Sequence, residues 1–108
     1  MTDLNLEEIK GLNNYKLMCL IALTFPKSEQ FDHTNDDYVI KHIFERVLHK
    51  FGIGTYVDRH EAIEIMKHSG FNCKYDPSNK RTMFNLNRAA MNHIRINSTY
   101  ERWFDDQV

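Results

Sequence analysis

The sequence predicts a single α+β domain that is mostly helical and contains one β-hairpin. Apolar residues recur at helical spacing through most of the chain, and between residues 71 and 87 they alternate with polar residues, as in a strand. With 108 residues and an apolar fraction of 42%, the chain is long enough to build one hydrophobic core. We therefore expect residues 1–108 to form one domain, with helices at residues 12–25, 36–51, 59–69 and 88–96 and a hairpin at 71–87.

The first predicted helix is the most apolar element of the chain. Residues 17–23 are all apolar, which predicts either a central core helix or a buried interface. The helical pattern extends over residues 5–25 and can be interrupted at residues 11–14; Asn5 is a candidate N-cap of this stretch, and Pro26 is expected to end it. Residues 26–35 are mainly polar, and we expect them to form a loop.

The second predicted helix has the clearest amphipathic pattern. Thr34 and Asp37 have the spacing of a capping box, and Gly52 has the position of a C-cap glycine. The apolar residues between these signals fall on one helical stripe, which is made of Ile40, Ile43, Phe44, Val47, Leu48 and Phe51.

The third predicted helix follows a short link. Asp58 and Glu61 have capping-box spacing, and Gly70 followed by the apolar Phe71 is typical of a Schellman cap. Its predicted inner face consists of Ala62, Ile63 and Met66.

The pattern then changes to that of a hairpin and a final helix. Two alternating segments flank a basic, polar turn at residues 76–80, and Asn87 is a candidate N-cap for the fourth helix. The predicted inner face of the hairpin consists of Phe71, Cys73, Tyr75, Thr82, Phe84 and Leu86.

The formal net charge of −1 is distributed unevenly along the chain. Residues 59–100 contain seven basic and three acidic residues, whereas residues 1–40 contain three basic and seven acidic residues. Residues 41–58 carry +1, and residues 101–108 carry −2. This division predicts a basic face that meets a polyanion, although ordinary scatter of surface charge gives the same pattern.

Two helices, a glycine and a hairpin with a basic tip follow one another in the order of a winged helix-turn-helix. Residues 44–87 resemble the DNA-binding lobe of the multiple-antibiotic-resistance regulator family. The similar parts are residues 47–53, residues 55–71, and the turn from Asp76 to Arg81, which looks like the Asp-Pro and basic wing tip of that family. In such proteins the second of the two helices enters the major groove of DNA, and the wing reaches an adjacent minor groove.

This resemblance and the basic segment together give a set of candidate DNA contacts. They are Thr55, Arg59, His60, Lys67, Lys74, Lys80, Arg81 and Arg88. The resemblance implies that the first three lie near the major groove, that Lys80 and Arg81 form the wing, and that Lys74 contacts phosphates. Few groups can read bases, so we expect a transcription regulator that binds duplex DNA as a homodimer, formed through the apolar first helix or the aromatic C-terminus.

The alternative is a non-enzymatic adaptor or inhibitor that binds another protein, for example a viral factor acting on a host enzyme. Arg59 falls toward the inner stripe of the third helix, whereas Glu61 and Glu64 fall on its outer face, where carboxylates repel phosphate. Three aromatic residues at helical spacing either close the core against the first helix or anchor a partner; they are Tyr100, Trp103 and Phe104.

Catalytic and metal functions have no motif in the sequence. There is no nucleophile elbow, phosphate-binding glycine loop or metalloprotease motif, so we expect neither an enzyme nor a cofactor. His60, Glu64 and His68 share a helix face but span about 12 Å, which is too long for one metal centre. Cys19 and Cys73 occupy apolar positions and are interpreted as small buried hydrophobes.

The start of the chain and its apolar runs predict a cytoplasmic protein without a membrane segment. The first residues are acidic rather than basic, and the longest apolar run, residues 17–25, is broken by Thr24 and is shorter than the roughly twenty residues that a bilayer requires. Asn, Lys and Ile, which have AT-rich codons, outnumber Gly, Ala and Pro. This bias predicts an AT-rich genome, and a bacteriophage is one candidate source.

Overall fold

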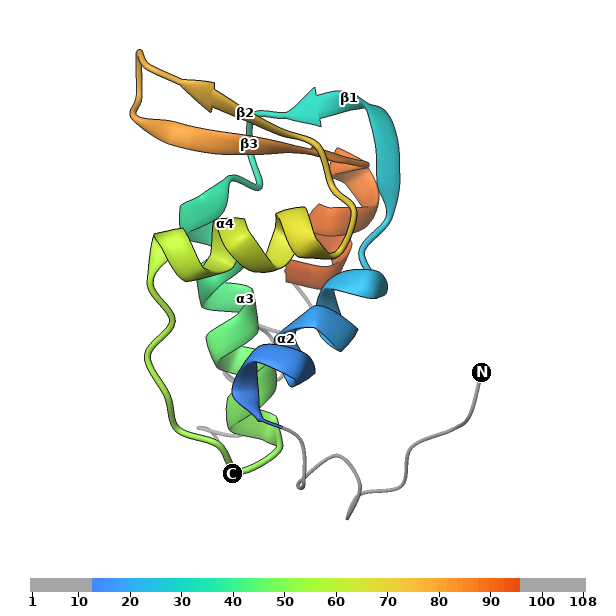
Figure 1. Ribbon diagram of the computed structural model, residues 1–108. Helices are drawn as coiled ribbons and strands as arrows, with labels where there is room; N and C mark the ends of the chain where they lie inside the picture. The colour runs from blue at the N-terminus through green and yellow to red at the C-terminus, as the bar shows by residue number, and fades with distance from the viewer. Residues whose placement is uncertain (1–12, 96–108) are drawn as a thin grey trace, which may run out of the picture.

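The computed structural model describes residues 13–95 (Figure 1). In chain order, the elements are α2 (Asn14–Leu23), β1 (Lys27–Asp32), α3 (Asp37–Lys50), α4 (Arg59–His68), β2 (Cys73–Asp76), β3 (Arg81–Leu86) and a helical segment at residues 88–95. The proposed cap at Asn5 and the aromatic residues Tyr100, Trp103 and Phe104 lie outside the described range.

The three strands form one antiparallel sheet in the order β1-β3-β2, and the helices pack beneath one face of it (Figure 1). This arrangement confirms the predicted α+β class. Among the described helices, none combines the length and the apolar character that crossing a membrane requires.

Strand β1 corrects the prediction of a loop at residues 26–35. Lys27 pairs with Leu86 and Asp32 pairs with Phe84, with an irregularity in the register between them. Its residues are mostly exposed or half-buried. An edge strand that buries so little produces no apolar alternation, so the sequence alone gave no signal for it. The predicted hairpin is therefore the larger part of a three-stranded sheet.

Helix α2 buries only one of its sides within the described part of the chain. Asn13 caps it by accepting a hydrogen bond from the backbone of Lys16 at 2.8 Å. Leu17, Met18 and Ala22 are buried in the core, but other apolar side chains of this helix remain exposed. The prediction of a central core helix is therefore correct for one side of α2 only.

Helix α3 buries the predicted stripe but begins with a different cap. The Asp36 carboxylate accepts hydrogen bonds from the backbone of Tyr38 and Val39, so Asp36 replaces the predicted Thr34 cap. Gly52 ends the helix in the left-handed region at φ +81°, as predicted. The fully buried members of the stripe are Ile40, Ile43, Phe44 and Leu48, whereas Val47 and Phe51 are half-buried.

Helix α4 begins and ends at the predicted signals. The Asp58 side chain accepts a hydrogen bond from the backbone of Glu61 at 2.8 Å. Gly70 has φ +92°, and the backbone of Phe71 donates to the Met66 carbonyl, which is the Schellman pattern. The inner face differs in one member, because the fully buried residues are Ala62, Ile65 and Met66, whereas Ile63 is half-buried.

The hairpin and the final helix also follow their predicted signals, with two exceptions. Asn87 caps the segment 88–95 by accepting from the backbone of Ala90 at 3.1 Å. Tyr75 is 58% exposed instead of facing the core. Met83 was predicted to face outward but is buried, although it does not belong to the main apolar cluster. Cys73 is half-buried, so the prediction of a buried thiol is only partly correct.

A buried carboxylate at the end of β1 joins three parts of the fold. The Asp32 side chain is fully buried and accepts hydrogen bonds from the backbone of Thr34, from the backbone and side chain of Asn35, and from Arg88 Nε. The Asn35 amide also donates to Asn92 Oδ1 at 3.0 Å. Burial raises the pKa of Asp32, but these hydrogen bonds outweigh it, and the net pKa is lowered.

We predict that Asp32→Ala lowers the free energy of unfolding by about 2–4 kcal/mol at neutral pH, because it leaves buried donors without an acceptor. Because the pKa of Asp32 is lowered in the folded state, its ionised form favours folding above the ordinary Asp pKa, and this contribution is lost as the pH falls through the folded pKa. Urea denaturation should therefore show the wild-type and variant curves converging below about pH 4. A stability difference that is the same at pH 7 and pH 3 would contradict this account.

Candidate functional site

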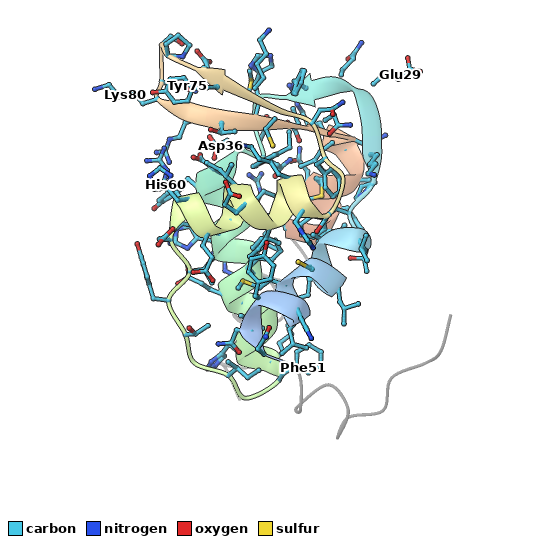
Figure 2. All side chains as sticks on the ribbon, in the orientation of Figure 1. Glu29, Asp36, Phe51, His60, Tyr75 and Lys80 are labelled. Carbon is cyan, nitrogen blue, oxygen red and sulfur yellow. The ribbon has the colours of Figure 1, made fainter. Side chains whose placement is uncertain are left out.

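The turn between β2 and β3, together with Asp76 and Arg81 at its ends, is called the hairpin tip here (residues 76–81). Asp76 Oδ1 accepts hydrogen bonds from the backbone and hydroxyl of Ser78, and these bonds lower the pKa of Asp76. Asn79 Oδ1 accepts from the backbone of Arg81, and Lys80 adopts φ +58°. The turn is therefore held by its own side chains and presents Lys80 to solvent beyond the body of the molecule (Figure 2).

Arg59, the first residue of α4, attaches the hairpin tip to the helices. Its Nη2 donates to the Lys80 carbonyl at 2.6 Å, and its Nε donates to Asp37 Oδ2 at 3.1 Å. The Asp37 side chain at the start of α3 is only 2% exposed. One guanidinium thus connects α3, α4 and the hairpin tip, and it holds Lys80 in a fixed place relative to the start of α4.

Tyrosine rings and cations gather at the same end of the molecule. The Arg81 guanidinium lies over the Tyr38 ring, 4.5 Å from its centroid. The Lys41 ammonium lies 4.8 Å from the centroid of Tyr56 and 5.9 Å from that of Tyr38. Both distances suit cation–π attraction. We call Tyr38, Lys41, Tyr56 and Arg81 the tyrosine–cation cluster.

Sequence reasoning did not select the two tyrosines or Lys41. A signal was present, because Tyr38 lies outside the apolar stripe of α3 and Tyr56 lies in the polar link before α4. An aromatic residue outside a core stripe is a candidate contact residue. The spacing along the chain could not show that the Tyr38 and Tyr56 rings lie near one ammonium.

Acidic neighbours offset part of the positive charge of this end. Lys41 Nζ lies 3.0 Å from Glu45 Oε1, and His42 Nδ1 lies 3.4 Å from the same oxygen. Burial, helped by the charges of Lys41 and Arg46, lowers the pKa of His42 despite Glu45. Within residues 13–95, Lys80 and Arg81 form no ion pair; Lys80 is exposed, whereas Arg81 is half-buried and its Nη1 atom is buried without a hydrogen-bond partner among these residues.

The structure brings together only some of the predicted DNA contacts. Arg59, His60, Lys80 and Arg81 lie at the hairpin-tip end of the molecule (Figure 2), and Thr55 lies in the link that leads to α4. Three other candidates lie elsewhere on the fold; they are Lys67 in the last turn of α4, Lys74 on β2 and Arg88 after β3.

Each of those three has a different neighbourhood. Lys67 is about 12 Å along α4 from Arg59 at 1.5 Å per residue. Lys74 Nζ lies 6.0 Å from the Phe31 ring centroid. Arg88 Nε is paired with Asp32 at 3.1 Å, at the opposite end of β3 from the hairpin tip. The eight candidates therefore do not form one continuous face.

The outer face of α4 has mixed charge, as the helical spacing indicates. His60, Glu64 and Lys67 are exposed, and Glu61 is half-buried. Burial first, and then the nearby Asp58 charge, raise the pKa of Glu61. This face is therefore less suited to a phosphate backbone than the hairpin-tip end is.

The cysteines and histidines of the described part of the chain belong to no three-residue metal site. No group of three His, Cys, Asp or Glu side chains within residues 13–95 is placed to hold a metal ion. Burial raises the pKa of the Cys73 thiol, with Lys67 acting in the opposite direction. A raised pKa keeps the thiol protonated at neutral pH and makes it a poor nucleophile.

We predict that Arg59→Ala releases the hairpin tip. The variant leaves the buried Asp37 carboxylate without its cation, so the free energy of unfolding should fall by about 2–4 kcal/mol. Hydrogen exchange of the amides at residues 78–81 should also accelerate. His60→Ala, at the exposed neighbouring position, is the matched control and should change stability by less than about 0.5 kcal/mol. Equal effects of the two variants would contradict the proposed role of Arg59.

Comparison with known protein families, curated proteins and solved structures finds no match for this sequence.

Proposed function

We propose that this protein is a DNA-binding regulator of winged-helix type that contacts duplex DNA through the hairpin tip and the start of α4. The observation that carries this proposal is the Arg59 bridge, which holds Lys80 and the adjoining Arg81, two cations without an ion pair among residues 13–95, beside the first turn of α4. The order of two helices, a glycine and a basic hairpin supports it further.

We propose that DNA contacts α4 only at its first turn, and not along its whole outer face. Glu61 and Glu64 disfavour a close approach of phosphates to the middle of the helix. A cationic hairpin tip can instead enter a minor groove while His60, in the first turn of α4, meets the neighbouring major groove. Contacts of Lys80 and Arg81 with phosphates would supply most of the affinity and make it depend strongly on salt.

Exposed apolar residues on α2 support the second part of the proposal, which is association of two copies. Leu23 is 63% exposed, and Tyr15 and Leu20 are each 39% exposed. A single copy offers few phosphate contacts, so pairing two copies would raise the affinity for DNA.

The same α2 residues favour the second candidate function, a module that binds another protein. Large apolar and aromatic side chains dominate the energetics of protein interfaces. Tyr100, Trp103 and Phe104 lie outside the described residues, so their partner-binding role stays a prediction. Absence of DNA binding at low salt would favour this second candidate.

We predict that Lys80→Ala combined with Arg81→Ala weakens duplex binding and reduces the slope of log affinity against log salt by about 2, because two phosphate contacts are lost. Fluorescence anisotropy with a short labelled duplex, between about 50 and 200 mM salt, measures both quantities. Lys16→Ala combined with Lys50→Ala is the matched control, because it removes two charges from the start of α2 and the end of α3, away from the hairpin tip (Figure 1).

The control should bind with the wild-type salt slope. Wild-type affinity and slope in the hairpin-tip variant, or no retention of duplex DNA at low salt, would refute the proposed function.

A further inference from the structure

Tyr38 and Tyr56 expose more aromatic surface than the fold requires. Tyr56 is 72% exposed and Tyr38 is 45% exposed. Neither ring belongs to the apolar cluster that forms the core. Both rings lie within 6 Å of the Lys41 ammonium, so they belong to one patch although they come from α3 and from the link before α4.

The exposed rings are suited to a ligand with flat, apolar faces and negative charge. Phosphate contacts alone use cations and hydrogen-bond donors, and they leave tyrosine faces unused. Bases inside a duplex are covered by their neighbours, whereas unpaired bases offer their faces for stacking on aromatic side chains. Arg81, over the Tyr38 ring, and the adjacent Lys80 supply positive charge for the phosphates between such bases.

We infer that the tyrosine–cation cluster binds unpaired nucleotides next to a duplex, as at an overhang or a fork. This inference rests on the proposed DNA-binding function and specifies the substrate class. The hairpin tip contacts the duplex, and the Tyr56 ring stacks on a base of the adjoining single strand.

The distribution of charge agrees with a base contact at Tyr56 and phosphate contacts at the hairpin tip. The Lys41 ammonium is paired with Glu45 at 3.0 Å, so Lys41 adds little net charge beside Tyr56. Arg81 and Lys80 have no such partner among residues 13–95. We therefore expect a base contact at Tyr56 and phosphate contacts at the hairpin tip.

The test compares three DNA ligands by fluorescence anisotropy. The first is a blunt duplex, the second is the same duplex with a short thymidine overhang, and the third has an overhang of equal length built from abasic sugars. The abasic overhang retains the phosphates and lacks the bases, so the affinity ratio of the last two ligands isolates stacking. A base stacked on one aromatic ring should raise the affinity about 5- to 100-fold.

Tyr56→Ala should reduce that ratio to about 1, since stacking is its only expected source. Tyr56→Phe keeps the aromatic face and should preserve the wild-type ratio. His49→Ala removes an exposed ring from the last turn of α3, about 12 Å along the helix from Lys41, and should also leave the ratio unchanged. Circular dichroism of each variant confirms that it is folded.

The inference and the proposed function fail in different ways. Equal binding of thymidine and abasic overhangs, or an unchanged ratio in Tyr56→Ala, would overturn the inference. If the blunt duplex still binds in a manner that depends on Lys80 and Arg81, the proposed function survives that result. If Tyr56→Ala weakens blunt-duplex binding as much as overhang binding, Tyr56 serves the duplex and the inference is wrong. If no ligand binds, both proposals fall.

Discussion

Two guanidinium groups attach the hairpin tip to the helices: Arg81 lies over the Tyr38 ring, and Arg59 supplies the hydrogen bonds. Arg59 donates to the buried Asp37 carboxylate and to the Lys80 carbonyl, so a helix start, a neighbouring helix and a turn are fixed by one side chain. The bond from Arg59 to the Lys80 carbonyl adds to the strand pairing that holds β2 and β3 in the sheet, and it fixes the hairpin tip relative to the start of α4. Both proposed DNA contacts, at the tip and at the first turn of α4, require this fixed relation.

The two ends of β3 are stabilised by the same physical principle. At one end Arg59 neutralises Asp37, and at the other Arg88 neutralises Asp32. Each buried carboxylate comes from a segment that flanks the turn between β1 and α3, and each pairs with an arginine adjoining β3 or the hairpin tip. These arginines were predicted as DNA contacts from the family resemblance and the basic segment, yet each forms an ion pair with a buried carboxylate of the fold.

Local signals predicted much of the fold, and contacts between distant segments explain what was missed. Asp58, Gly52 and Gly70 act through their immediate neighbours, so the ends of α3 and α4 could be predicted. Strand β1 forms by antiparallel pairing of its backbone with β3. Its polar sequence has no alternation of apolar residues that could have predicted a strand. The candidate site was predicted in part, since Lys80 and Arg81 stand out in the sequence, whereas the patch of Tyr38 and Tyr56 forms only in the folded chain.

The most direct test of the central claim is a map of backbone amide shifts in isotope-labelled protein titrated with a short DNA duplex at low salt. The account predicts that perturbations gather at the hairpin tip and in the first turn of α4, around Lys80 and His60. Perturbations centred instead on the exposed face of α2, around Leu20 and Leu23, or no perturbation at all, would contradict it.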